Sequence, residues 1–183
     1  MSLSILRALA AAGCLLAAPA WALVPAPCDT VSFGVTLIKN NGWWGDLSGE
    51  AGCRRGELVG HVNYVDHEFK FHLRSTAITG YFYDPAVPNA RDICGVGVTD
   101  DGGSARFRVR VQDNGQGKNS TDMAGLVIDS TRPPFVIVVT TRLLVNGFHG
   151  GGNVQLHDTH GPPSGTGFFA PDEAQACGGL PPP

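Results

Sequence analysis

The sequence has few charged residues and no concentration of positive charge. Asp, Glu, Lys and Arg together make up only 16% of its 183 residues, and the formal net charge is -3. No basic stripe is present that could neutralise phosphates, so we expect no nucleic-acid partner. After residue 22, no apolar run reaches the roughly 20 residues that a membrane-spanning helix requires. We therefore expect no transmembrane span in the mature chain.

The common catalytic and metal-binding motifs are also missing. There is no His-Glu-x-x-His, no Cys-x-x-Cys and no Gly-x-Ser-x-Gly elbow. Carboxylates are available, but a glycosidase needs two of them facing each other across a cleft, which the sequence does not establish. We predict that the protein is not an enzyme, with a small secreted hydrolase as an alternative. Six histidines are expected to be solvated strand residues rather than transition-metal ligands: His61, His67, His72, His149, His157 and His160.

The N-terminal segment has the pattern of an export signal. Arg7 is followed by the short apolar stretch "ALAAAGCLLAAPAW", and Ala20-Trp21-Ala22 supplies the small residues of a cleavage site. We interpret residues 1–22 as a secretory signal peptide and expect a periplasmic or extracellular protein. The apolar stretch is too short for a membrane anchor. Lipidation at Cys14, which follows "AAG", is the other alternative.

Four cysteines remain in the mature chain, namely Cys28, Cys53, Cys94 and Cys177. An even number of cysteines in an exported protein predicts two disulfides, and three pairings are possible. We favour Cys28 with Cys177, because the ends of a domain often lie close together, which leaves Cys53 with Cys94. A zinc site is the rival interpretation, although no pair has the usual ligand spacing.

The remaining pattern is that of a β-protein. Glycine (25 residues) and proline (13) are frequent, and short apolar-alternating segments follow one another without a helical pattern. We predict an all-β domain over residues 23–160, an antiparallel sandwich or barrel of roughly 8–10 strands, and a Gly/Pro-rich tail over 161–183. "KNNGWWGDLSGEAGCRRG" and "DPAVPNARD" are expected to be loops. Strands are expected in "TVSFGVTLI", "ELVGHVNYVDH", "EFKFHLRSTAITGYFYD", "ICGVGV", "ARFRVRV", "MAGLVIDS", "PFVIVVTTRLLVNG" and "GGGNVQLH".

Two of these strands predict the direction of individual side chains. In "FKFHL", Phe69, Phe71 and Leu73 should face one way, and Lys70 and His72 the other. In "ARFRVRV", the apolar residues should be buried, and the alternating Arg106, Arg108 and Arg110 should form a solvated basic face. That basic face could alternatively contact an anionic polymer.

The polar stretch "VQDNGQGKNSTDMAGLVI" offers two interpretations. Its glycines do not have the spacing of a phosphate loop or of an EF-hand. A looser calcium site built from Asp113, Asn114 and Asp122 is one possibility. A connection between two strands is the one we favour, because Asn114-Gly115 tolerates the positive φ angles of a tight turn.

Trp43 and Trp44 are the best candidates for ligand contact. They lie in the glycine-rich "NNGWWGD", where exposed aromatic faces could stack on sugar rings. The alternative is that at least one of them packs against the core.

Several motifs, taken in order, resemble the secreted bacterial module known as the post-COAP domain. These are "FGVTLIKNNGWW", "GHVNYVDH", "VQDNGQGKNSTDMAGLVI" and "GGGNVQLH", which together cover roughly Val31 to His157. The resemblance implies an all-β fold on an exported or cell-surface protein, and it implies no catalytic residues. The four cysteines and the length of "GQGKNSTD" depart from the family pattern.

Together these observations predict a non-enzymatic structural or interaction module of the bacterial envelope or extracellular space. Its partner would be an envelope or extracellular protein or a glycan. A carbohydrate-binding module that uses Trp43 or Trp44 is the alternative. No cofactor is expected, apart from the calcium that Asp113, Asn114 and Asp122 could bind.

Overall fold

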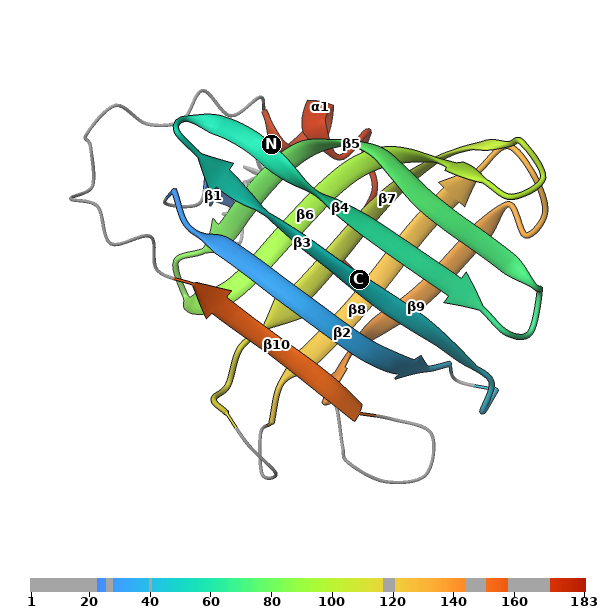
Figure 1. The fold of residues 1–183 in the computed structure, drawn as a ribbon, viewed down its shortest axis with the longest axis horizontal. Helices are drawn as coiled ribbons and strands as arrows, with labels where there is room; N and C mark the ends of the chain where they lie inside the picture. Colours follow the sequence, from blue (N-terminus) through green and yellow to red (C-terminus); the bar gives the residue numbers. More distant parts are fainter. Residues whose placement is uncertain (1–22, 26–27, 40, 117–120, 144–150, 158–171) are drawn as a thin grey trace, which may run out of the picture.

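A computed structural model describes residues 23–25, 28–39, 41–116, 121–143, 151–157 and 172–183. The chain forms one curled antiparallel sheet in which nine strands follow the order β10-β2-β3-β4-β5-β6-β7-β8-β9, with the short β1 paired to β5 (Figure 1). The all-β prediction is confirmed. The strands are β1 (Val24–Pro25), β2 (Thr30–Ile38), β3 (Trp44–Arg54), β4 (Glu57–Asp66), β5 (Phe71–Asp84), β6 (Val87–Thr99), β7 (Ser104–Gln112), β8 (Met123–Ser130), β9 (Val136–Leu143) and β10 (Gly151–His157).

The sheet curls so that its two halves enclose the core. Strands β10, β2, β3 and β4 cross at an angle in front of β6 to β9, as Figure 1 shows. In β2, alternation sends one row of side chains inward: four apolar residues are buried, while Gly34 and Thr36 lie on the outer face. The largest fully buried side chains are Tyr64, Tyr81, Phe82, Phe107, Leu47 and Leu73.

The segment predicted as a glycine-rich loop contains strand β3, so that prediction is wrong. β3 pairs with β2 along nine positions and with β4 along ten. A Cβ atom at Gly49 would lie 2.3 Å from the carbonyl oxygen of His61, and one at Gly52 would lie 2.3 Å from that of Asp29. These glycines therefore permit close approach within the sheet rather than turns. The "DPAVPNARD" loop is likewise shorter than predicted, since β6 already begins at Val87.

The prediction of two disulfides is confirmed, but the preferred pairing is wrong. The bonds join Cys28 to Cys53 and Cys94 to Cys177. The register of β2 against β3, in which Thr30 faces Gly52, brings Cys28 beside Cys53. Leu23 packs against the cluster that contains Cys177, so the described ends of the chain are close, as assumed. Proximity of the ends did not determine which cysteine bonds to which.

A C-terminal segment, residues 172–183, covers the outer face of β5, β6 and β7. It contains the single helical turn α1 (Glu173–Ala176), which no sequence pattern predicted. Phe82, Cys94 and Ala176 form a second apolar cluster beneath it. Within the described residues, no helix has the length and apolar character needed to cross a membrane.

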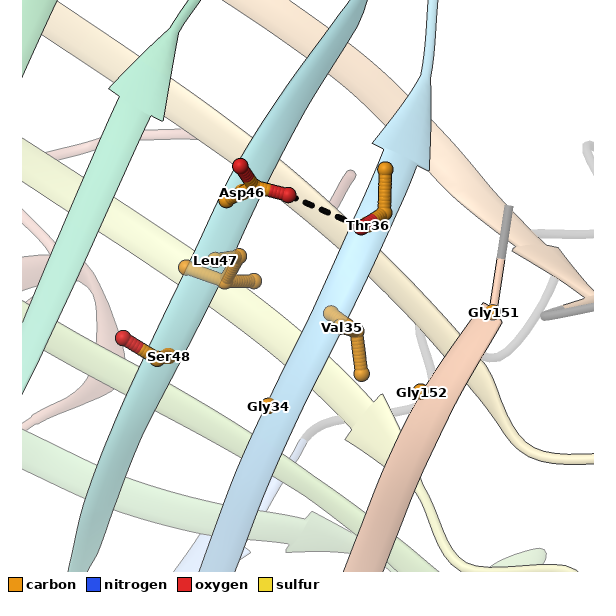
Figure 2. A pocket seen from close by; sticks show the side chains of 8 residues that line it. All are labelled: Gly34, Val35, Thr36, Asp46, Leu47, Ser48, Gly151 and Gly152. Atoms are coloured by element: carbon orange, nitrogen blue, oxygen red, sulfur yellow. Dashed lines mark hydrogen bonds between the residues drawn. The ribbon is translucent and has the colours of Figure 1, made fainter. Parts of the chain in front are cut away.

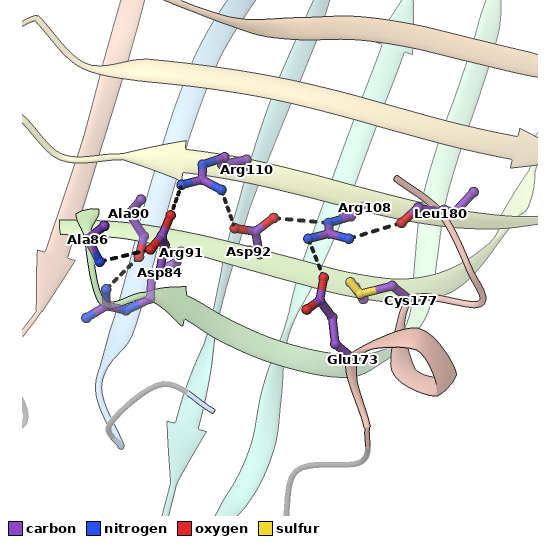
Figure 3. Close-up of polar contacts among 11 residues, drawn as sticks. Asp84, Ala86, Ala90, Arg91, Asp92, Arg108, Arg110, Glu173, Cys177 and Leu180 are labelled. Atoms are coloured by element: carbon purple, nitrogen blue, oxygen red, sulfur yellow. Dashed lines mark hydrogen bonds and ion pairs between the residues drawn. A yellow bond between two sulfur atoms is a disulfide. The ribbon is translucent and has the colours of Figure 1, made fainter. Parts of the chain in front are cut away.

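The same segment buries part of the arginine row, so the expected solvated face is only partly observed. The Arg108 side chain is 3% exposed, and its guanidinium bonds to Asp92 at 3.0 Å, to Glu173 at 2.8 Å and to the carbonyl oxygen of Leu180 at 3.0 Å (Figure 3). Arg106 stays exposed, and Arg110 is half-buried. Because its charge is fully paired, Arg108 can be tolerated beneath the segment.

Candidate functional site

The candidate site lies where two strand connections meet at one end of β3. β3 pairs with β2 on one side and with β4 on the other, so the β2–β3 and β4–β5 connections end side by side. Trp43 belongs to the first connection and is 46% exposed, and Phe69 belongs to the second and is 51% exposed. We call Trp43, Trp44 and Phe69 the aromatic platform.

The two tryptophans are arranged as a stack on the surface. Their ring centroids are 6.1 Å apart with an interplanar angle of 20°. The His67 ring, which directly follows β4, lies 5.6 Å from that of Trp44 and continues the row. Neither tryptophan belongs to the core, so the alternative that one of them packs there is wrong. Trp43 is thus exposed and Trp44 half-buried beside it; their contact with a ligand stays a prediction.

Phe69 was predicted to face the same way as Phe71 and Leu73, and this prediction is wrong, because Phe69 is exposed and the other two are buried. Lys70 adopts a positive φ of 51°, which interrupts the extended backbone, and β5 begins only at Phe71. The alternation rule failed at Phe69 because it holds only within a continuous strand.

A buried ionic cluster fixes the platform from below. Lys39 Nζ donates to both carboxylate oxygens of Asp66 at 3.0 Å, forms a further ion pair with Glu68, and lies 4.4 Å from the centroid of the Phe69 ring. Asp66 also accepts the backbone N–H groups of Glu68 and Phe69 at 3.0 and 3.1 Å. The connection that carries Phe69 is therefore held in one conformation, which lowers the entropic cost of binding.

Two titratable groups of this cluster, Glu68 and Tyr64, have pKa values shifted by their surroundings. Hydrogen bonds from Lys39 and Asn41 lower the pKa of Glu68, which therefore stays ionised. Tyr64 donates its hydroxyl hydrogen to Asp66 at 3.0 Å. Burial, reinforced by Asp66, raises the pKa of Tyr64 far above its ordinary value, so it remains a neutral donor.

A polar rim continues from Trp44 along the outer face of β2 and β3. His67 Nε2 lies 2.8 Å from one oxygen of Asp46, and the Thr36 hydroxyl donates to the other oxygen at 2.8 Å. Beyond this pair is an open hollow of about 300 Å³ above Gly34 (Figure 2). The hollow is lined by Gly34, Val35, Thr36, Asp46, Leu47, Ser48, Gly151 and Gly152.

The three residues proposed to bind calcium do lie together, but the two carboxylates accept backbone N–H groups, and the Asn114 side-chain amide donates to the carbonyl oxygen of Thr121 at 2.7 Å. Asp122 accepts the N–H groups of Asn114 at 2.9 Å and of Val154 at 2.8 Å, and Asp113 accepts that of Leu156 at 2.9 Å. The carboxylates thereby tie the β7–β8 connection to the edge strand β10. β7 and β8 pair directly across this connection, which confirms the strand connection we favoured. Within the described ranges, no group of three or more His, Cys, Asp or Glu residues could hold a metal ion.

The histidines are distributed over the surface rather than gathered in one place. His72 contacts Asp100 at 3.2 Å, and His61 is exposed; His149 and His160 lie outside the described residues. His157 Nε2 lies 2.8 Å from Ser32 Oγ, which resembles a nucleophile–base pair. However, β2 is paired on both sides, so the backbone amides around Ser32 are engaged in the sheet and do not form an oxyanion hole.

No family model, curated protein or solved structure matches this chain. The site therefore has to be interpreted from its own geometry. Sequence reasoning found Trp43 and Trp44 but missed Lys39 and Phe69. In the sequence, Lys39 follows the predicted strand Thr30–Ile38 and is 27 residues before Asp66. Its contact with the "DHEF" segment becomes evident only once the pairing of β2, β3 and β4 is known.

Proposed function

We propose that this protein is an exported, non-enzymatic binding module of the bacterial envelope or extracellular space, and that it binds a glycan. Export is supported by the signal-like residues 1–22 and by two disulfides, which suit an oxidising compartment. The resemblance to the post-COAP module agrees with this location. The observation that carries the binding role is the stacked pair Trp43 and Trp44, in which Trp43 is 46% exposed and Trp44 is half-buried.

The chemistry of the aromatic platform favours a sugar. The C–H faces of a pyranose ring are apolar and flat, so they complement aromatic faces, while its hydroxyl groups require donors and acceptors at the edge. Here the aromatic faces adjoin the His67, Asp46 and Thr36 network. Aromatic residues grouped on a surface and rimmed by polar groups are typical of an interaction site.

The rigidity of the platform supports the same proposal. Lys39 and Asp66 hold the Phe69 connection in place, and Trp44 is anchored at the start of β3. Little side-chain freedom would be lost on binding, so a modest contact area can produce a measurable affinity.

The test is binding of the oxidised mature domain, residues 23–183, to a panel of neutral oligosaccharides and envelope polysaccharides. Affinity electrophoresis would serve for the polymers, and tryptophan fluorescence titration for the soluble oligosaccharides. We expect Trp43→Ala to weaken binding by roughly thirtyfold, because truncating a central aromatic contact costs about 2 kcal/mol.

Phe135→Ala is the matched control. Phe135 is 60% exposed but lies just before β9, and its removal should leave binding unchanged. Failure of the wild-type domain to bind any carbohydrate would overturn the glycan proposal and favour a protein partner. Equal binding by Trp43→Ala and wild type would place the contact elsewhere.

A further inference from the structure

Gly34 occupies a position where neither packing nor backbone conformation requires a glycine. It lies in the middle of β2 and is exposed, and a Cβ atom added there would meet nothing within 4 Å. Its φ angle is not in the positive region. By contrast, Cβ atoms at Gly49 and Gly152 would each lie 2.3 Å from a backbone oxygen.

A glycine in the interior of a strand weakens it, and often marks a place where another molecule comes close to the backbone. The missing side chain at Gly34 contributes to the open hollow of about 300 Å³, which Gly151 and Gly152 of β10 also line. This volume is at the lower end of the range for small-molecule sites, roughly 300–1,000 Å³. Because no internal contact requires glycine at position 34, we ascribe its presence there to the open space that it leaves on the outer face.

The lining of the hollow is suited to hydroxyl groups. The Ser48 hydroxyl can donate and accept, and the Thr36 hydroxyl, which donates to Asp46, can still accept. Asp46 provides a carboxylate already oriented by Thr36 and His67 (Figure 2). Asp46 is the charged residue among those that line the hollow, so a polyanion would be repelled. The occupant is therefore polyhydroxylated and not acidic.

The hollow and the aromatic platform are two separate contacts along the same strands. Trp44 faces Ile38 across β2 and β3, Asp46 faces Thr36, and Ser48 faces Gly34. Trp44 and Ser48 are four residues apart on β3, a distance of about 13 Å at roughly 3.3 Å per residue. Their side chains point to the same face because the spacing is even. A single sugar ring placed against one contact leaves the other empty.

We propose that the hollow above Gly34 is a second subsite, and that the ligand is an extended, uncharged oligosaccharide lying along β2 and β3 from the aromatic platform to the hollow. This inference rests on the proposed glycan-binding function and names the ligand's length and its charge. It predicts that affinity increases with chain length until both contacts are occupied.

The experiment measures the affinity of the mature domain for a neutral homo-oligosaccharide series, from the monosaccharide to the hexasaccharide, chosen from the sugar that the wild type binds. We expect wild-type affinity to rise at least tenfold along the series. Gly34→Val, which fills the hollow with a residue suited to strands, should remove that increase while leaving the affinity for the shortest bound sugar unchanged. Its melting temperature should be equal to or higher than that of the wild type.

Two further variants keep the outcome interpretable. Ser48→Val also narrows the hollow and should likewise remove the increase of affinity with chain length. This variant replaces Gly34→Val in the test if Gly34→Val does not fold. Thr76→Val, on the outer face of β5, is the matched control and should bind like the wild type. Trp43→Ala should weaken binding at every chain length.

Each outcome separates the two proposals. A length-dependent affinity that survives in folded Gly34→Val and Ser48→Val would overturn the subsite and leave the glycan-binding function intact. Equal wild-type affinity for monosaccharide and hexasaccharide would do the same. Absence of wild-type binding to any member of any series would overturn both.

Discussion

The contact between Asp122 and the edge strand β10 leads to a quantitative prediction about stability. Asp122 is 1% exposed, and its two carboxylate oxygens accept the backbone N–H groups of Asn114 and Val154. β10 is at one end of the strand order and uses its other side to pair with β2. The N–H group of Val154 therefore depends on Asp122, and truncating the side chain to alanine would remove its acceptor.

The expected cost follows from these two bonds. A hydrogen bond to a charged group contributes about 1.5–3 kcal/mol, and a buried donor left unsatisfied costs about 1–3 kcal/mol. Asn114 lies in a connection where water can replace the lost acceptor, since it is exposed, but the bond to Val154 is buried. We therefore expect Asp122→Ala to lower the free energy of unfolding by about 3 kcal/mol. Asp122→Asn, which retains one carbonyl acceptor, should lower it by about half as much.

The assay is urea unfolding of the oxidised domain, with amide hydrogen exchange of Val154 as the local measurement. In Asp122→Ala, exchange at Val154 should accelerate more than exchange in the central strands β3 and β4. Arg54→Ala, on an exposed side chain, is a control that should change stability by less than about 0.5 kcal/mol. A loss below 1 kcal/mol in Asp122→Ala, or unchanged protection of Val154, would refute the assigned role. Calcium added to the wild type would show separately whether these carboxylates also bind the metal.

Two further predictions concern the disulfides and Glu68. The chain-entropy relation gives a stabilisation of roughly 3.5 kcal/mol for the Cys28–Cys53 bond and roughly 4.5 kcal/mol for the Cys94–Cys177 bond, from sequence separations of 25 and 83. Replacing Cys94 and Cys177 with serine should therefore destabilise the domain by about 1 kcal/mol more than replacing Cys28 and Cys53. Equal losses in urea unfolding, or a non-reducing peptide map with another pairing, would contradict this. The pKa of Glu68 is lowered in the folded state, so its contribution to stability is present above the ordinary value of 4.5 and is lost as the pH falls through the lowered pKa. Glu68→Gln should therefore show a shallower loss of stability with acid than the wild type, and an identical acid profile would argue against the ion pair.

Strands were predictable from sequence where buried and outward residues alternate, as in β2, or where a short apolar run is bounded by polar residues, as in β8. Thr30–Ile38 and Met123–Ser130 were identified with the same boundaries as β2 and β8. β3 was missed because a segment rich in glycine has the composition of a loop. Gly49 and Gly52 are instead required by the close approach of the neighbouring backbone. That approach is a property of the sheet, which a single segment cannot reveal.

The site shows the same division between local and non-local information. Trp43 and Trp44 were identified because exposed aromatic residues beside glycine are a local pattern. Asp113 and Asp122 were identified as a group, but their partners lie on β10, more than 30 residues later in the chain. An aspartate that accepts backbone N–H groups and an aspartate that binds a cation cannot be told apart in the sequence. Only the position of β10 distinguishes the two roles here.

Two regions of the outer face of the sheet differ in how they are covered, and this difference explains the location of the proposed ligand site. On β5 to β7, the C-terminal segment is held by the Cys94–Cys177 bond and by Arg108, and it covers a second apolar cluster. On β2 and β3, by contrast, Gly34 and Ser48 remain exposed. A protein that needed only a stable sheet would gain strand propensity from a β-branched residue at Gly34, where space is available. That it carries glycine at this open position, in line with a fixed aromatic platform, is the strongest structural argument that the face of β2 and β3 is kept clear for another molecule.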